Sequence, residues 1–534
     1  MKVLTAAQMR EADRITSQRY GIPSLQLMEN AGAAIAEFLR QTFPGLQQRK
    51  IVVLSGKGNN GGDGIVVARL LKDSGCAPEV FLFADPGAVQ GDAAANLKRW
   101  QQGLGKLRVA TSLPEWESAR GILDGADLIV DALLGTGLHG PVKGLLASVI
   151  NDVNAARAGG GGRTAVVAVD MPSGLASDAQ DFAGPVVAAD FTVTLTAPKL
   201  GQLVLPRSSS CGALVVRSIG TPPDLLESDP QLKIHWIEPG EFRALPLSRA
   251  ADANKGNYGH ALIVAGSLGK SGAAVLAARG ALRSGAGLVT VATPQAVQPV
   301  VAAGMPEMMS IPLACTEAGT VSFRDFENGR FTETARGKSV IAMGPGLSTQ
   351  SETQEFIRAL VSQADLPIVL DADGLNAYTG MADRLNQRHA PAMALTPHPG
   401  EMARLLGVTA KDVQARRLEV ALDAAGRWRA HVVLKGFHTI LATTSGHAYI
   451  NTTGNAGMAT GGTGDVLTGI LAGLTAQFGV EDWPRVLSFG IYLHGLAGDI
   501  AASRVGQASL IASDLVESIP EAFMRVLAEW EHGR

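Results

Sequence analysis

The residues whose types and spacing most clearly suggest chemistry lie late in the chain, within 451–470. Four glycines precede an apolar run of helical length at 466–476: Gly457, Gly461, Gly462 and Gly464. Glycine allows positive φ and lets another molecule approach the backbone closely. A helix is predicted to begin at about Thr463, so its free N–H groups and positive dipole end would face the loop. The segment is therefore predicted to bind an anion, and phosphate is the expected one.

Asp465 lies in the first turn of this predicted helix. One interpretation is that the aspartate only stabilises the helix dipole. Beside a phosphate-binding loop, however, a second negative charge is unfavourable unless it has a chemical role. A base that takes a proton from a hydroxyl while that hydroxyl attacks a phosphoryl group needs this position. Because the chain has no Walker A sequence, we predict phosphoryl chemistry outside the P-loop class.

Length and composition favour a large protein with several buried cores. The chain has 534 residues, of which 46% are hydrophobic and 18% charged. Length alone suggests about three to four domains. A net charge of −3 and a pI of about 6.4 provide no basic surface for nucleic acid or an anionic membrane. We therefore expect neither nucleic acid nor a membrane as a partner.

The termini and cysteines favour a cytoplasmic protein. Glu11 and Asp13 introduce charge too early for a secretory or transit segment, and no run of about 18 uninterrupted apolar residues occurs. Cys76, Cys211 and Cys315 are odd in number and lack metal-ligand spacing, which favours a reducing compartment.

The first half of the chain alternates strand and helix patterns. Strands are predicted at 50–55, 79–84, 127–133, 164–169, 191–197 and 213–219. The first is a continuous apolar run, as expected for a parallel strand that is buried on both faces. This alternation predicts an α/β fold, a Rossmann-like three-layer αβα sandwich around a mostly parallel sheet.

A glycine- and asparagine-rich segment, 56–64, follows the first predicted strand. It matches the dinucleotide fingerprint G-x-G-x-x-G, with Asp85 where a ribose-binding acid would lie, but such a match alone is weak. Asn59, Asn60 and Asp63 make the motif more specific because they add side-chain ligands to backbone N–H groups. The alternative is a simple Asn/Gly turn.

Two further strand ends carry carboxylates. Asp131 precedes a glycine-rich loop that runs to Pro141, and Asp170 precedes Ser173. Ligands of open α/β sheets bind beyond the carboxyl ends of the strands. We therefore expect these loops and the 56–64 segment to converge on one binding crevice.

Over about residues 1–220 these motifs resemble the NAD(P)H-hydrate epimerase domain, the YjeF N-terminal family. The resemblance implies catalysis by Asp170, with Lys199 as a second acid/base candidate. The alternative interpretation of Lys199 is an ordinary lysine in a turn. It also implies a K⁺ site, and all-oxygen ligands suit a hard cation without choosing potassium. The implied ligands of K⁺ are Asn60, Asp131 and Ser173. The implied substrate contacts are Asn59, Asn60, Gly61, Gly62, Asp63, Gly135, Thr136, Gly137, Leu138, His139, Gly140, Pro141 and Asp170.

The second half again places unusual residues at strand ends. Domains are expected at 1–222 and 247–534, with a proline-containing linker at 223–246. His398 lies between two prolines that restrict its backbone, which suits a residue of a binding site. The alternative interpretation is a histidine with only a structural role. Lys435 precedes a glycine and is suited to contact a nucleotide phosphate. The alternative interpretation is a solvent-exposed lysine at a strand end.

From about residue 254 onward the chain resembles ADP- or ATP-dependent NAD(P)H-hydrate dehydratase, which has a ribokinase-like αβα fold. The resemblance implies Mg²⁺ with the nucleotide, and Asp465 as the catalytic base. The implied substrate contacts are Ala274, Gly346, His398 and Asp465. The implied nucleotide contacts are Lys435, Gly436, Phe437, His438, Thr439, Gly462, Thr463 and Gly464.

Together the resemblances imply a bifunctional enzyme that repairs hydrated NADH and NADPH. The first domain would interconvert the R and S hydrates. The second would dehydrate the S hydrate to NAD(P)H, AMP and phosphate, with ADP favoured by family analogy. A homo-oligomer is expected. The alternatives are a ribokinase-like metabolite kinase and a first domain that only binds ligands; a plain dehydrogenase is disfavoured.

Overall fold

A computed structural model describes residues 1–159, 163–178, 182–204 and 206–532 of the chain. The chain divides into two compact units, Met1–Lys233 and Ile234–Arg534, called unit 1 and unit 2 below. Each unit is built around its own sheet, which agrees with the prediction of two α/β domains.

Unit 1 contains seven parallel strands among its described residues, in the order β3-β2-β1-β4-β5-β6-β7. The strands are β1 (Ile51–Ser55), β2 (Glu79–Leu82), β3 (Leu107–Val109), β4 (Leu128–Ala132), β5 (Ala165–Val169), β6 (Phe191–Leu195) and β7 (Ala213–Arg217). The helices are α1 (Ala6–Arg19), α2 (Ser24–Thr42), α3 (Asn59–Asp73), α4 (Gly91–Gln102), α5 (Leu113–Ala119), α6 (Gly144–Gly159), α7 (Leu200–Val204) and α8 (Pro223–Glu227).

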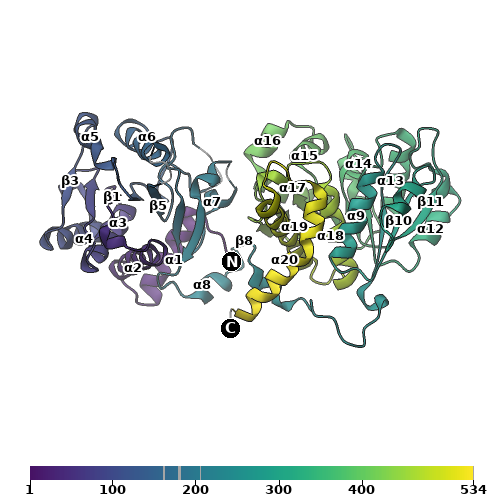
Figure 1. Ribbon diagram of the computed structural model, residues 1–534, viewed down its shortest axis with the longest axis horizontal. Helices are drawn as coiled ribbons and strands as arrows, with labels where there is room; N and C mark the ends of the chain where they lie inside the picture. The colour runs from purple at the N-terminus through teal and green to yellow at the C-terminus, as the bar shows by residue number, and fades with distance from the viewer. Residues whose placement is uncertain (160–162, 179–181, 205, 533–534) are drawn as a thin grey trace. The chain divides into compact units, whose positions relative to one another are not determined.

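Both faces of the unit 1 sheet are covered by helices. Ile51 and Val53 of β1 pack in a core with residues of α2, α3 and α4. The alternate residues Val52 and Leu54 pack in a second core with residues of α5 and α6. Figure 1 shows the strands between these two groups of helices. This arrangement confirms the three-layer sandwich predicted from the continuous apolar run.

Unit 2 contains a ten-stranded sheet in its described part, in the order β11-β10-β9-β12-β13-β14-β15-β16-β17-β8. Its strands are β8 (Ile234–Trp236), β9 (His260–Val264), β10 (Leu288–Pro294), β11 (Met309–Leu313), β12 (Val340–Met343), β13 (Ile368–Leu370), β14 (Met393–Leu395), β15 (His431–Leu434), β16 (Ile440–Ala442) and β17 (Ala448–Ile450). The run from β11 to β15 is parallel, and β16 pairs antiparallel with both of its neighbours.

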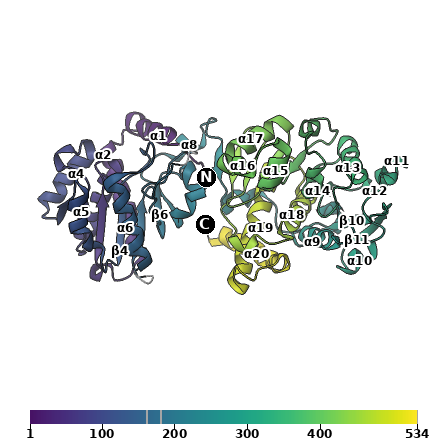
Figure 2. The ribbon, with the colours of Figure 1, turned by 90° about the horizontal axis from the view of Figure 1, so that it is seen from above.

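Helices also cover this sheet. They are α9 (Ser271–Arg283), α10 (Gln298–Ala303), α11 (Arg324–Glu327), α12 (Arg330–Ala335), α13 (Ser351–Gln363), α14 (Ala372–Asn376), α15 (Pro399–Leu406), α16 (Ala410–Ala415), α17 (Arg417–Trp428), α18 (Thr463–Phe478), α19 (Trp483–Val505) and α20 (Ala512–His532). One core of unit 2 joins the sheet to α9, α18, α19 and α20. Figure 2 shows α13, α15 and α17 on the opposite side from α9 and α20.

Close packing between α9 and α18 depends on glycine. A Cβ atom at Gly469 would lie 1.9 Å from the carbonyl oxygen of Ala277. Only a residue without a side chain allows the two backbones to approach this closely. The contact fixes α18, which carries Asp465, against the core.

The segment expected to be a linker, 223–246, is divided between the two units. Its first part forms α8 in unit 1, and β8 pairs parallel with β17 in unit 2. Phe242 is completely buried and lies 5.0 Å from Phe489 between ring centroids. The second unit therefore begins at Ile234 and not at residue 247, because apolar side chains in this proline-containing stretch join its sheet and core.

One described helix, α19, is long and apolar enough to cross a membrane by length and composition. In the structure, 72% of its most apolar window is buried inside the protein. It therefore packs inside the protein as a core helix.

Candidate active sites

The predicted residues of unit 1 meet at a cavity of about 1140 Å³. It lies where the strand order reverses between β1 and β4, which is the ligand-binding edge of an open α/β sheet. The predicted residues that line it are Asn59, Asn60, Asp63, Gly135, Thr136, Gly137, Leu138, Asp170 and Lys199. Five other predicted contacts are absent from the described lining: Gly61, Gly62, His139, Gly140 and Pro141.

The asparagine-rich motif forms the first turn of α3 and not a loop before it, because α3 begins at Asn59. A Cβ atom at Gly61 would lie 1.9 Å from the carbonyl oxygen of Gly56. One at Gly64 would lie 2.5 Å from Cβ of Ala132 on β4. These glycines therefore bring the positive end of α3 against the strand ends, where its free N–H groups face the cavity.

The three predicted K⁺ ligands lie around the backbone of Leu134. Ser173 Oγ donates to Asp131 Oδ1 at 2.6 Å and accepts from the Leu134 N–H at 2.9 Å. Asn60 Nδ2 donates to the Leu134 carbonyl at 3.1 Å. Three side chains from α3, β4 and the loop after β5 are thus brought together.

This cluster has the character of a cation site. Asp131 is completely buried, and burial raises the pKa of its carboxyl to about 6 despite the hydrogen bonds from Ser173. The Oδ1 atom of Asn60 is buried without a hydrogen-bond partner among the described residues. A buried oxygen without a partner is costly, and a hard cation would satisfy it.

Asp170 and Lys199 form a buried ion pair beside the same cavity. Lys199 Nζ donates to Asp170 Oδ1, which also accepts from the Leu195 N–H at 3.1 Å. The side chain of Lys199 is 0% exposed and that of Asp170 is 14% exposed. Asp170 has a φ of 62°, a left-handed conformation that only some residues tolerate. The fold thus holds this carboxylate in one orientation toward the cavity.

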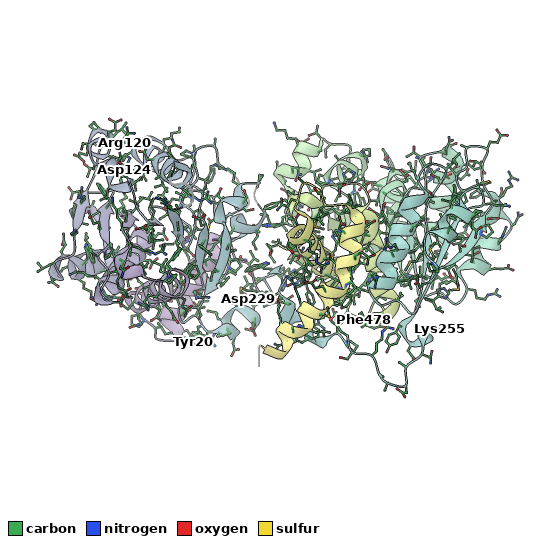
Figure 3. The ribbon with its side chains drawn as sticks, viewed as in Figure 1. Tyr20, Arg120, Asp124, Asp229, Lys255 and Phe478 are labelled. Atoms are coloured by element: carbon green, nitrogen blue, oxygen red, sulfur yellow. The ribbon has the colours of Figure 1, made fainter. Side chains whose placement is uncertain are left out.

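In unit 2, α18 begins at Thr463, which confirms the predicted start of the helix. Its N-cap, Gly462, has a φ of 93°, and a Cβ atom there would lie 2.5 Å from Leu276 Cδ1. Figure 3 labels Phe478, the C-terminal residue of α18. Asp465 lies at the other end of this helix, about 20 Å away at 1.5 Å per residue.

A buried network lies beside the N-terminal end of α18. Asp371, which follows β13, accepts from Lys435 Nζ at 2.7 Å and from Thr468 Oγ1 at 2.7 Å. Asp371 is 1% exposed. A Cβ atom added at Gly464 would lie 3.3 Å from Lys435 Nζ. The network thus joins a strand-end lysine to the helix that carries Asp465.

Asp465 has the electrostatic character of a general base. Burial and the charge of Asp371 raise the pKa of its carboxyl to about 6, although the charge of Lys435 lowers it. A base that is half protonated near pH 6 is ionised at neutral pH yet still basic enough to take a proton.

The predicted nucleotide loop, 435–439, is held by Arg417 from α17. Its guanidinium donates to the carbonyls of Phe437 and Leu434, the latter at 3.3 Å. Burial lowers the pKa of Arg417 to about 10. Phe437 is 55% exposed and stacks on His438 with ring centroids 4.0 Å apart. The loop therefore presents an aromatic face to solvent while its backbone is fixed from behind.

His398 is the N-cap of α15. The ring atom Nδ1 accepts from the Gly400 N–H at 3.0 Å, and the backbone N–H of His398 donates to Glu401 Oε2 at 2.8 Å. Burial and the Lys435 charge lower the pKa of the imidazole. The side chain remains 50% exposed and can also face a ligand.

The two remaining predicted contacts differ in accessibility. Gly346 has a φ of 64° and accepts from Ser267 Oγ at 2.7 Å. Asp373 holds the adjoining loop because it accepts from the Ser348 N–H at 2.8 Å. Ala274 is 0% exposed in the core of unit 2, so its role as a substrate contact stays a prediction.

Several residues of these sites were missed from the sequence. Asp371 and Glu401 carried a signal, because they follow strand ends and lie in the same segments as Asp373 and His398. Thr468 lies three residues after Asp465, one helical turn along α18. Arg417 carried no signal, since its partners are backbone carbonyls about 20 residues away in the chain.

The chain thus has two α/β units, one with an ion-paired carboxylate at a cavity and the other with a carboxylate of raised pKa in the first turn of α18. Residues 24–201 match the family model of the YjeF-related protein N-terminus, and residues 261–521 match that of NAD(P)H-hydrate dehydratase. A bifunctional NAD(P)H-hydrate repair enzyme from Moorella thermoacetica is 44% identical over 99% of this chain and 98% of its own length. The relative of the same name from Escherichia coli is 32% identical over 96% of this chain and 92% of its own.

The chain belongs to the family of bifunctional NAD(P)H-hydrate repair enzymes. Solved structures that resemble it cover about half of the chain. The ADP/ATP-dependent NAD(P)H-hydrate dehydratase from Bacillus subtilis, co-crystallised with ATP and Mg²⁺, is 31% identical, with a TM-score of 0.48 over 55% of this chain and 99% of that one. A ribokinase-like superfamily protein from Enterococcus faecalis is 25% identical, with a TM-score of 0.47 over 55% of this chain and 96% of that one.

Proposed function

We propose that this chain restores hydrated NADH and NADPH to the active cofactors. Unit 1 interconverts the two epimers of the hydrate, and unit 2 uses ADP or ATP to dehydrate the S epimer. The observation that carries the proposal is Asp465, a base of raised pKa in the first turn of a helix whose N-terminus suits a phosphoryl group. The likeness over almost the whole chain to enzymes named for this repair supports it.

The chemistry of the hydrate explains why phosphoryl transfer helps. Water adds to the enamine of a reduced nicotinamide so that the hydroxyl is bonded to the carbon beside the ring nitrogen. Asp465 takes the hydroxyl proton as that oxygen attacks the terminal phosphorus of the nucleotide. The free N–H groups from Thr463 onward stabilise the charge on the transferred group. The ring nitrogen then expels phosphate, and loss of a proton from the neighbouring carbon restores the double bond.

Mg²⁺ is expected to bind with the nucleotide, where it neutralises phosphate charge. The described residues contain no group of three or more His, Cys, Asp or Glu arranged to hold a metal. Mg²⁺ in such sites needs only one or two carboxylates besides the phosphates. The candidate ligands are Asp371, Asp373 and Glu401, the carboxylates whose charges act on Asp465. Asp371 is also bound by Lys435 and Thr468, and Glu401 by the His398 N–H.

K⁺ is the proposed cation of unit 1. Asn60, Asp131 and Ser173 would hold it, and the buried Oδ1 of Asn60 that lacks a partner supports this assignment. The cation would supply a fixed positive charge below the cavity. Its effect is therefore expected on epimerisation and not on dehydration.

The experiment is to follow the near-ultraviolet absorbance of NADH when the purified protein meets an equal mixture of both epimers, Mg²⁺ and either ADP or ATP. Recovery of all the NADH is expected, with ADP the favoured nucleotide. Replacing K⁺ by choline should slow only the second half of the recovery. Recovery that stops at one epimer's share would remove the epimerase proposal. No recovery, with a stable phosphorylated product instead, would favour the metabolite kinase.

The dehydration rate should depend on pH through Asp465. Because the base must be ionised and its pKa is about 6, the rate should fall about tenfold per unit below pH 6 and level off above about pH 7. Initial rates with the pure S epimer and saturating nucleotide test this without a contribution from unit 1. A flat profile down to about pH 5 would exclude Asp465 as the titrating base.

A further inference from the structure

Asp13 is an acidic side chain of unit 1 that neither the sequence motifs nor the proposed mechanism uses. It lies on α1 and lines the same cavity as Asp170 and Lys199. Its Oδ1 atom is buried and has no hydrogen-bond partner among the described residues. A buried carboxyl oxygen without a partner is unfavourable unless it serves a ligand. Asp13 is thus available to a molecule in the cavity.

Lys199 is poorly suited to be the second proton-transfer group. Its side chain is completely buried, and its three N–H bonds point to protein acceptors. Besides Asp170 Oδ1, these are Thr194 Oγ1 at 3.0 Å and the Leu195 carbonyl at 2.9 Å. With every donor occupied, Lys199 can orient Asp170, but it has no proton that faces a substrate.

Epimerisation nevertheless needs two groups, because bond breaking on one face and bond formation on the other require an acid and a base. We propose that Asp13 is this second group and exchanges protons with the substrate in partnership with Asp170. This inference rests on the proposed function, since it assigns a role within the epimerisation of the nicotinamide hydrate.

The charges around Asp13 fit the role of an acid. Burial, with a smaller contribution from repulsion by Asp170, raises the pKa of Asp13 to about 6, although the charge of Lys199 lowers it. The pKa of Asp63 is raised well above its usual value, first by burial and then by Asp170 and Asp13. The other charged side chains that line the cavity are Arg10 and Arg14 of α1, Lys57 after β1, Asp85 after β2 and Asp92 of α4. Arg14 pairs with Glu11. Asp13 can therefore carry a proton, while Asp170 is the carboxylate that pairs with Lys199.

The step balances as follows. Asp13 gives its proton to the hydroxyl of the hydrate, the C–O bond breaks, and water leaves as the ring nitrogen forms an iminium ion. A water molecule on the other face then bonds to the same carbon and loses a proton to Asp170. Asp13 is left ionised and Asp170 protonated, and the reverse sequence converts the opposite epimer. One water leaves and one enters, and no bond is oxidised or reduced.

Asp13→Asn in the full-length protein tests the proposal. Epimer interconversion is measured without nucleotide by chromatography of the R and S hydrates, with the spontaneous rate subtracted. The variant should lose about 100-fold or more in kcat with little change in KM, since asparagine keeps the shape but cannot donate the proton. Because the acid has a pKa of about 6, the wild-type rate should fall as the pH rises above about 6, and any activity left in the variant should lack this fall. Asp13→Glu should recover part of the rate.

Glu11→Gln is the matched control, because Glu11 lies on the same helix and is exposed. It should epimerise at the wild-type rate, and nucleotide-dependent dehydration of the S epimer should be unchanged in all three variants. If Asp13→Asn epimerises within threefold of wild type, or keeps the fall in rate above about pH 6, Asp13 is not the acid. If the wild-type protein itself does not accelerate interconversion, the proposed function of unit 1 fails instead.

Discussion

Asp465→Asn is expected to abolish the nucleotide-dependent recovery of NADH while epimerisation continues at the wild-type rate. Asparagine keeps the size of the side chain at the first turn of α18 but cannot accept the hydroxyl proton. Loss of a general base costs about 100- to 10,000-fold in rate. We expect the upper part of this range, because the hydroxyl is a poor nucleophile until it is deprotonated. The loss should appear in kcat and not in the affinity for nucleotide.

The measurement is the initial rate of NADH formation from the pure S epimer, with epimer exchange followed separately. Asp482→Asn is a suitable control, since Asp482 also lies at the start of a helix, α19, but is exposed and paired with Arg485. The control should dehydrate at the wild-type rate. A rate for Asp465→Asn above about one tenth of wild type would show that another group takes the proton.

Asp170→Asn is expected to leave NADH recovery incomplete, stopping at the share of the S epimer. The amide still accepts a hydrogen bond from the Leu195 N–H, so the local backbone can remain in place. It loses the charge that pairs with the completely buried Lys199. Without an ionised base, epimerisation should slow about 1,000-fold. Because an unpaired buried lysine destabilises the fold, the unfolding temperature of unit 1 should fall as well.

Chromatography of the two hydrates measures this loss, and dehydration of the pure S epimer reports whether unit 2 is intact. Asp127→Asn is the control, because Asp127 precedes β4 at the amino ends of the strands, away from the cavity, and accepts from the Lys50 N–H at 2.8 Å. Wild-type epimerisation by Asp170→Asn would mean that unit 1 only binds its ligand or uses a different base.

The sequence predicted elements that depend on local patterns. The start of α18 at Thr463 could be predicted because a cluster of glycines ends at Gly464 and an apolar run begins at Val466. The start of α3 at Asn59 could not, since asparagine and glycine favour turns by themselves. Contact of Gly61 with the Gly56 backbone selects the helix, and that contact exists only in the folded unit.

The same distinction between local patterns and distant contacts applies to the residues of the candidate sites. Strand-end residues such as Asp170 and Lys435 could be placed at the correct sheet edge from the alternation of strands and helices. Their partners could not be predicted, because Lys435 binds Asp371 from 64 residues away in the chain. Asp13 was overlooked for a similar reason: it lies near the start of the chain and reaches the cavity only when α1 packs beside it.

The pairing of β8 with β17 has a practical consequence for dividing the gene into separate enzymes. β8 is the outermost strand of its sheet and precedes the boundary that composition suggested. A fragment that starts at residue 247 would strip it away and leave β17 with a row of unpaired N–H and C=O groups, which recruits other chains and promotes aggregation. A fragment that starts at Ile234 keeps that edge covered, so the better place to cut is 13 residues earlier than composition indicates.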